Sequence, residues 1–209
     1  RQAMNNFWIP EEINLNQDIK DYRKLDSHEK RAYDMIISFL TYLDSIQTAN
    51  LPNLQTYVTA NEINLCLSIQ TYQESIHSQS YSDDHLLRRN EFIGEQYNEF
   101  LEKDNEFQFV KALIANYILE GIYFYSGFSF FYNLGRNGKM PGTVQEIRYI
   151  NRDENTHLWL FRSLINDLKK ERPDLFTPEA THIYREMLKE GVRQEIEWGK
   201  YAIGDNIAG

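Results

Sequence analysis

The sequence contains few of the residues that characterise several classes of protein. Among its 209 residues there are one cysteine, five prolines and ten glycines. The single cysteine, Cys66, excludes an intramolecular disulfide and is typical of a protein of the reducing cytoplasm. So little glycine and proline excludes collagen-like and low-complexity chains, in which these residues dominate.

Positive charge is also scarce. Lysine and arginine total 22 against 31 aspartates and glutamates, for a formal net charge of −9. Because contacts to phosphates require a basic surface, this balance excludes a general nucleic-acid binder. No charge-free apolar run approaches the roughly 18 residues of a membrane span, and no basic-then-apolar leader is present. We therefore expect a cytoplasmic protein without a membrane segment.

Apolar and aromatic residues at helical spacing are what the sequence has instead. Hydrophobic residues make up 42% and aromatic residues 14%, enough for a sizeable core. Asp26 and Glu29 resemble a capping box at the start of one periodic stretch. The expected helices cover residues 26–47, 61–81, 91–102, 107–134, 144–164 and 178–201. The sequence predicts a single all-α domain over residues 1–209, in which long antiparallel helices follow an N-terminal arm at residues 1–25.

Acidic side chains interrupt the apolar stripes of four of these helices. Asp44 continues the line of Tyr33, Ile37 and Leu40, whose steps of four, three and four residues mark one helical face. Glu120 stands in the most apolar stretch of the chain. Two further acids open Glu-x-x-His pairs, which place a carboxylate and an imidazole on one face: Glu74–His77 and Glu154–His157.

Four buried carboxylates require compensation, because even one isolated buried charge costs about several kcal/mol. A lone Glu-x-x-His is usually part of a solvated face, and a lone buried acid is more often paired within a core. Together, however, single acids on two helices and Glu-x-x-His on two others form the ligand pattern of dinuclear iron and manganese bundles. The combination predicts a dinuclear metal site. The remaining histidines, His28, His85 and His182, lie in polar contexts and are expected at the surface.

The residues around these acids resemble a known family. The segments concerned are Phe-Trp-Ile-Pro-Glu-Glu (7–12), Leu-Asp-Ser-Ile-Gln (43–47), Gln-Glu-Ser-Ile-His-Ser-Gln-Ser-Tyr (73–81), Glu-Gly-Ile-Tyr-Phe-Tyr-Ser-Gly-Phe (120–128) and Arg-Asp-Glu-Asn-Thr-His (152–157). Over about residues 7–204 the chain resembles the small (beta) subunit of class I ribonucleotide reductase. The resemblance implies a ferritin-like bundle of long antiparallel helices that encloses a dinuclear metal site.

The resemblance also implies which residues hold the metals. One ion would be bound by Asp44, Glu74, His77 and Glu154, and the other by Glu74, Glu120, Glu154 and His157. Carboxylates and imidazoles suit two iron ions, and the same ligands serve two manganese ions, for which a flavoprotein activator is a further expected partner. An aspartate at position 44 and a tyrosine at position 81 argue against the manganese–iron branch that dispenses with the tyrosine.

In the resembled family, a stable tyrosyl radical forms when the reduced dinuclear centre reacts with dioxygen. Tyr81, one turn after His77, matches the radical position, whereas a tyrosine taken alone is more often a packing residue. Phe124, Phe128 and Ile150 match the apolar pocket around that tyrosine. The pocket would exclude water and reductants and so prolong the life of the radical.

Trp8 and Asp153 match the start of the family's electron-transfer chain, with Asp153 hydrogen-bonded to His77. Without the family, Trp8 indicates an anchored N-terminal arm and Asp153 a polar neighbour. The radical would pass to a separate large subunit that reduces ribonucleotides to deoxyribonucleotides for DNA replication, and the small subunit would be a homodimer. Family members continue into a tail with a relay tyrosine and a docking segment, which nothing up to Gly209 resembles.

Two alternatives belong to other functional classes. A ferritin-like oxidase or hydroxylase would act on its own bound substrate and would require an open apolar tunnel to the metals. An iron-storage bundle would assemble into a hollow shell and bind many more than two metal ions per chain. The Trp8, Asp153 and Tyr81 positions favour the radical-generating role over both.

Overall fold

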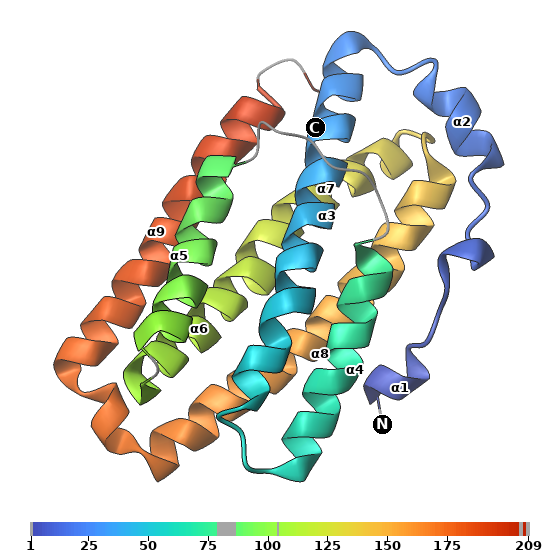
Figure 1. Ribbon diagram of the computed structural model, residues 1–209. Helices are drawn as coiled ribbons and strands as arrows, with labels where there is room; N and C mark the ends of the chain where they lie inside the picture. Colours follow the sequence, from blue (N-terminus) through green and yellow to red (C-terminus); the bar gives the residue numbers. More distant parts are fainter. Residues whose placement is uncertain (1, 79–86, 104, 205–206, 208–209) are drawn as a thin grey trace.

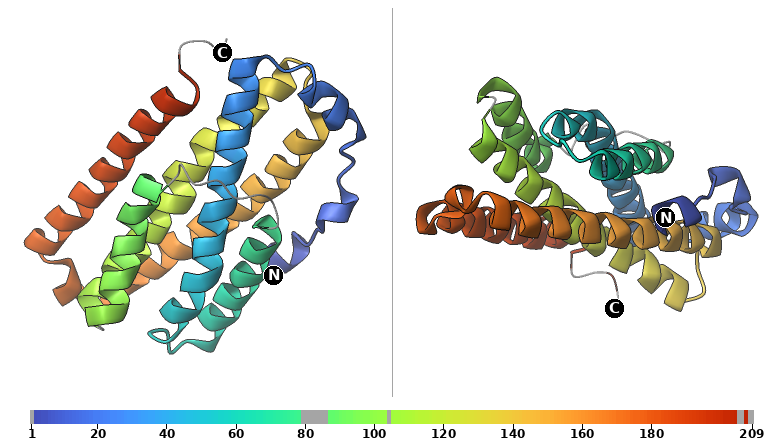
Figure 2. Two further views of the ribbon diagram at one scale, coloured as in Figure 1. Left: turned by 45° about the horizontal axis from the view of Figure 1, so that its top comes forward. Right: turned by 90° about the horizontal axis from the view of Figure 1, so that it is seen from below.

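The computed structural model describes residues 2–78, 87–103, 105–204 and 207, and these residues form helices and connecting segments without a β-strand among them. The long helices run side by side in an elongated bundle (Figures 1 and 2). In chain order the bundle consists of α3 (Ser27–Gln55), α4 (Asn61–His77), α5 (Leu87–Lys103), α6 (Glu106–Ile118), the short segment η3 (Leu119–Tyr123), α7 (Phe124–Arg136), α8 (Pro141–Glu171) and α9 (Pro178–Ala202). No described helix is both long and apolar enough to cross a membrane. The expected all-α class is confirmed.

Helix α3 begins as predicted and ends later than predicted. The Asp26 carboxylate accepts hydrogen bonds from the backbone N–H groups of His28 and Glu29, both at 2.8 Å, and the Glu29 carboxylate accepts one from the Asp26 N–H at 3.2 Å. The predicted end near residue 47 was wrong, because α3 continues to residue 55 with Pro52 inside it. Fully buried leucines on both sides of the proline, Leu51 and Leu54, offset its cost of about 3 kcal/mol.

The apolar stretch predicted as one buried helix is continuous but not uniform. Helices α6 and α7 are joined directly by η3, a π-helical segment of five residues that contains Glu120. Wider turns of this kind are rare and occur mostly at functional sites. The local geometry at Glu120 therefore differs from that of a regular α-helix, which periodicity alone does not indicate.

The N-terminal arm contains short helices and runs along the opposite edge of the bundle from α9 (Figures 1 and 2). Its elements are α1 (Gln2–Asn5), η1 (Pro10–Glu12) and α2 (Asn16–Tyr22). The arm contacts α4 through α1, and α8 through both α1 and α2. These contacts place residues near position 8 beside the two helices that carry the Glu-x-x-His pairs.

Asp18 of α2 fixes the beginning of α8. Its carboxylate, which is 4% exposed, accepts hydrogen bonds from the backbone N–H groups of Gly142 at 2.8 Å and Thr143 at 2.6 Å. The Thr143 hydroxyl donates a third, at 2.7 Å. A side chain at position 142 would collide with the backbone carbonyl of Asn14, because a Cβ there would lie 2.6 Å from that oxygen. A buried acid and a glycine thus join the arm to the first turn of α8.

Candidate metal centre

Four segments of the bundle each contribute an acid to one buried cluster. Asp44 comes from α3, Glu120 from η3, and the two Glu-x-x-His pairs come from α4 and α8. The i,i+3 spacing places each histidine one turn after its glutamate on the same helical face. All six predicted ligands are buried, with exposed fractions of 0–4%: Asp44, Glu74, His77, Glu120, Glu154 and His157.

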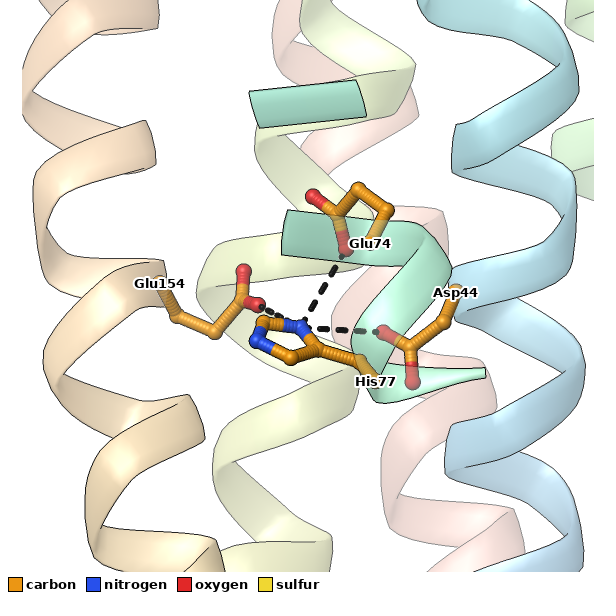
Figure 3. Close-up of side chains that lie close together, drawn as sticks. All are labelled: Asp44, Glu74, His77 and Glu154. Carbon is orange, nitrogen blue, oxygen red and sulfur yellow. Dashed lines mark ion pairs between the residues drawn. The ribbon is translucent and has the colours of Figure 1, made fainter. Parts of the chain in front are cut away.

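Three carboxylates surround His77 (Figure 3). Its Nδ1 lies 3.4 Å from Glu154 Oε1, 3.5 Å from Glu74 Oε2 and 3.7 Å from Asp44 Oδ1. One ligand atom from each of these four residues fits within a group whose members lie within 4.8 Å of one another. That arrangement provides four ligand atoms from three helices around one point.

A second group of four residues lies against the first. His157 Nδ1 is 3.3 Å from Glu74 Oε1, 3.4 Å from Glu154 Oε2 and 3.9 Å from Glu120 Oε2. Together with Glu74, Glu120 and Glu154, His157 forms a group in which one ligand atom from each residue lies within 4.8 Å of the others. Glu74 and Glu154 belong to both groups and turn one oxygen toward each histidine. The geometry suits two cations bridged by two carboxylates.

Several atoms that line the cluster have no hydrogen-bond partner among the described residues, although they are fully buried. They are Asp44 Oδ1, Glu74 Oε2, His77 Nδ1, Glu120 Oε2 and Glu154 Oε1. Buried polar atoms are almost always paired in native proteins, so a set of five facing one another indicates a missing partner. The set contains four carboxylate oxygens and one imidazole nitrogen, which are the types of ligand atom that iron and manganese bind. The residues therefore fit a dinuclear metal centre.

The electrostatics of the cluster favour a cation at its centre. Burial raises the pKa of Asp44 and of Glu120 well above the usual carboxyl range, because each lies among other acids away from water. Burial alone would lower the pKa of His77 and His157, but the surrounding carboxylates raise both well above the ordinary imidazole value. Burial also opposes ionisation of Glu74, yet the two imidazoles lower its pKa to about 2. Positive charge between the acids is what stabilises their ionised forms.

The other nitrogen of His77 connects the cluster to the N-terminal arm. His77 Nε2 lies 3.5 Å from Asp153 Oδ2, and the same oxygen accepts a hydrogen bond of 2.9 Å from the indole N–H of Trp8. The Trp8 and His77 rings are stacked, with centroids 6.0 Å apart. Trp8 is 5% exposed and Asp153 is completely buried. The arrangement orients His77 so that its Nδ1 points to the centre of the cluster.

The predicted radical pocket is described only in part, because Tyr81 and His85 lie outside the described residues. Phe124, Phe128 and Ile150 are buried, with exposed fractions of 0%, 1% and 8%. The rings of Phe124 and Phe128 are stacked, with centroids 5.8 Å apart. Their relation to Tyr81 stays a prediction.

Amide side chains form a second layer around the cluster that the sequence analysis missed. Gln70 Nε2 and Asn116 Nδ2 donate hydrogen bonds to Glu120 Oε1 at 2.7 and 2.8 Å, and Gln47 Nε2 donates to the same oxygen. Gln73 Oε1 lies 3.0 Å from His157 Nε2. The only signal in the sequence is their helical spacing from the acids, since Gln70 is one turn before Glu74 and Asn116 one turn before Glu120.

A family model described as "Ribonucleotide reductase, small chain" matches this sequence in two parts, residues 1–83 and 82–209. The chain belongs to this family. The ribonucleotide reductase resemblance drawn from the sequence motifs is thereby confirmed. The two matched parts together contain all six residues of the buried cluster.

Relatives of the small-chain family match the whole of this chain. The chain is 61% identical to the "Ribonucleoside-diphosphate reductase subunit beta" of Treponema pallidum (strain Nichols), with coverage of 100% of this chain and 66% of the relative. It is 37% identical to the subunit of the same name from Halalkalibacterium halodurans, with coverage of 100% and 67%. The chain thus spans about two thirds of the length of these relatives.

Solved structures of small chains have the same fold. The ribonucleotide reductase R2 subunit from Clostridium botulinum has a TM-score of 0.95 at 49% identity, with coverage of 99% of this chain and 72% of that chain. An R2-like ligand-binding oxidase with an Mn/Fe cofactor has a TM-score of 0.78 at 22% identity, covering 95% of this chain and 77% of that chain, and it shares the fold alone. The expected ferritin-like class is confirmed.

Proposed function

We propose that this chain is the radical-generating subunit of a class I ribonucleotide reductase, an oxidoreductase that is active only with a separate large subunit. The observation that carries the proposal is the pair of four-residue groups that share Glu74 and Glu154. Membership of the small-chain family supports it. The names of the relatives support ribonucleoside diphosphates as the substrates that the large subunit reduces.

The two groups divide the ligands between two metal ions, which we propose to be iron, with manganese as the alternative for the same donors. Asp44 and His77 would serve the first ion, Glu120 and His157 the second, and both shared glutamates would bridge. When bound and reduced, the metal centre would react with dioxygen and so supply the oxidising power needed to form the tyrosyl radical. The unpaired buried oxygens support this assignment, because each gains a partner when the cations are present.

The protein's own residues would then move one electron and one proton. Tyr81 would lose an electron and its phenolic proton to become the stored radical. Trp8 and Asp153 would form the first part of the path by which an electron returns to Tyr81 from the large subunit. The continuous contacts from Trp8 through Asp153 to His77 support that path. Asp153 would accept the indole hydrogen bond and keep the His77 ring in position.

The size of the accessible space supports radical generation rather than oxidation of a bound organic substrate. Among the described residues, a pocket of about 110 Å³ reaches His157, and its lining includes Gln70, Trp159 and Leu160. Pockets for small organic ligands usually measure about 300–1,000 Å³. A space of this size suits a diatomic molecule or water.

Assembly and location follow from the same proposal. Large apolar side chains remain exposed on or next to α1, α4 and α8: Met4, Phe7, Leu65 and Trp159. We expect a homodimer of about 50 kDa, twice the 24.9 kDa chain, in which a second copy reduces this exposure. The cytoplasm is the proposed compartment, with a flavoprotein activator as a partner if the metal is manganese. Sedimentation that shows only monomer, or a large hollow shell, would contradict this assembly.

Removal of a bridging acid tests the metal assignment. Glu154→Ala deletes a ligand of both ions and should leave far fewer than two metals per chain, as measured by elemental analysis after reconstitution with iron. His182→Ala, at an exposed histidine of α9, is the control and should retain the parent stoichiometry. Two firmly bound metals in Glu154→Ala would refute the shared-ligand arrangement.

A further inference from the structure

One oxygen of Glu120 receives three amide donors from three helices. Gln70 of α4 donates at 2.7 Å, Asn116 of α6 donates at 2.8 Å, and Gln47 of α3 donates to the same atom, Oε1. These amide side chains are 0–1% exposed, so no bulk water competes for the hydrogen bonds. We call Gln47, Gln70 and Asn116 the amide cluster.

Further hydrogen bonds fix the orientation of each amide group. The second N–H of Gln47 donates to Asn116 Oδ1 at 2.5 Å, and Gln47 Oε1 accepts from the Tyr97 hydroxyl at 3.0 Å. The second N–H of Gln70 lies 3.3 Å from Glu74 Oε1. A flip of Gln47 or Asn116 would place carbonyl oxygens against one another and remove several buried hydrogen bonds at once. The amide cluster is therefore a rigid set of donors.

The other oxygen of Glu120 is in a different state. Oε2 is buried, has no hydrogen-bond partner among the described residues, and lies 3.9 Å from His157 Nδ1. The two oxygens of one carboxylate are thus differentiated. Oε1 faces three donors, and Oε2 faces the group that we assign to the second metal. Asp44, the corresponding single acid of the first group, has no amide donor among the described residues.

We propose that the amide cluster makes Glu120 a one-oxygen ligand of the second metal, bound through Oε2. An oxygen that accepts three hydrogen bonds has no lone pair left for a cation, so chelation through both oxygens would require at least one amide to leave. The neutral donors also stabilise the carboxylate charge without adding a cation that would compete with the metal. Gln47, Gln70 and Asn116 are positioning residues, because they act on the metal only through Glu120.

The two sites should consequently respond differently to loss of an amide. Without the donors from Gln70 and Asn116, Glu120 Oε1 keeps only the hydrogen bond from Gln47, which leaves a lone pair to bind the second metal as a further ligand. Because the amide cluster touches no residue that belongs to the first group alone, the first metal should keep its ligands. The predicted signature is a change in coordination at one metal of the pair.

The test is the structure of the manganese-loaded full chain and of a double variant, Gln70→Met with Asn116→Leu. In the parent protein, only Oε2 of Glu120 should lie within bonding distance of the second manganese, and both oxygens should do so in the variant. A parent structure with both oxygens bound, or a variant in which one oxygen remains bound, would overturn the proposal. Gln70→Met alone provides a milder change if the double variant folds poorly.

A measurement in solution complements the two manganese-loaded structures. Cobalt(II) in place of manganese should give a visible absorption that weakens for the second equivalent in the double variant, since added ligands reduce the intensity of such bands. Gln108→Met is the matched control, because this buried glutamine of α6 makes no hydrogen bond to the amide cluster among the described residues, and it should leave the spectrum unchanged. An unchanged second-equivalent band in the double variant would count against the amide cluster.

This inference rests on the proposed metal site, and the metal titration separates the two failures. If two ions bind per chain and both oxygens of Glu120 bind the second metal in the parent protein, the proposed role of the amide cluster is wrong and the proposed metal site is retained. If no ions bind at the six ligands, the proposed function fails first and the role of the amide cluster fails with it.

Discussion

Trp8 and Asp153 are joined by a 2.9 Å hydrogen bond although 145 positions of the chain separate them. The bond attaches the N-terminal arm to the middle of α8 at a point where both side chains are buried. Since Asp153 also contacts His77, the conformation of the arm and the orientation of a proposed metal ligand depend on one carboxylate.

Trp8→Phe tests whether this contact carries an electron or only packs the arm. Phenylalanine keeps the aromatic packing on His77 but cannot donate to Asp153 or be oxidised as easily as an indole. We expect normal metal content, slower oxidation of Tyr81, and turnover with the large subunit reduced by about 10–100-fold or more. Trp159→Phe, at a tryptophan that is 69% exposed, should change none of these values. Normal turnover in Trp8→Phe would exclude Trp8 from the path.

Tyr81→Phe separates metal binding from radical storage. The phenol is not a proposed ligand, so both metals should remain, whereas the organic radical signal in electron paramagnetic resonance should disappear after exposure of the reduced protein to dioxygen. Tyr42→Phe, at an exposed tyrosine of α3, should keep the signal. Reductase activity at the parent level in Tyr81→Phe would favour an oxidant centred on the metals.

Asp18→Ala should destabilise the fold through the first turn of α8. Three hydrogen-bond donors would lose a buried acceptor, at a cost of about 1–3 kcal/mol in the free energy of unfolding. Asp167→Ala, at an acid of the same helix that is 63% exposed, should stay within about 0.5 kcal/mol of the parent. Urea unfolding measures both values, and equal stability of the two variants would refute the role of Asp18.

The buried phenol of Tyr33 should make the free energy of unfolding decrease at alkaline pH. Burial raises the pKa of its phenol from 10.0 to about 12, although the hydrogen bond with Thr143 opposes the shift. Between these values the folded state keeps a proton that the unfolded chain releases, so stability is complete below about pH 10 and falls as the pH rises toward 12. Tyr33→Phe lacks this loss and should gain on the parent over that range, by at most about 3 kcal/mol. Identical pH slopes for both proteins in urea unfolding would contradict the assignment.

The six residues of the buried cluster could be singled out from the sequence because their spacing is a property of single helices. The i,i+3 pairs and the position of Asp44 on its apolar stripe require no knowledge of neighbouring segments. The start of α3 is predictable for the same reason, because the Asp26–Glu29 capping box is local.

Features that depend on partners from elsewhere in the chain could not be predicted. Pro52 sits inside α3 because buried leucines hold the last turns in place, which overrides a local stop signal. Asp18 gave no signal of its own, since its three donors lie more than a hundred positions away. The amides around Glu120 come from three helices, and a buried glutamine has the same sequence appearance as a solvated one.

The π-helical turn at Leu119–Tyr123 changes the directions in which side chains point between the two halves of one continuous helix. Each residue of a regular α-helix advances the side-chain direction by about 100°, and a wider turn takes up an extra residue without completing a further revolution. Glu120 and the residues before it are thereby aimed independently of those that follow. In the second half, Gly127 is aimed at α3 so closely that a Cβ there would lie 3.0 Å from Ile36. If the same five residues wound as a regular α-helix, Gly127 would rotate away from α3 by about 100° and a bulkier side chain would face Ile36, whereas deletion of one residue would give a uniform helix with Gly127 still facing α3.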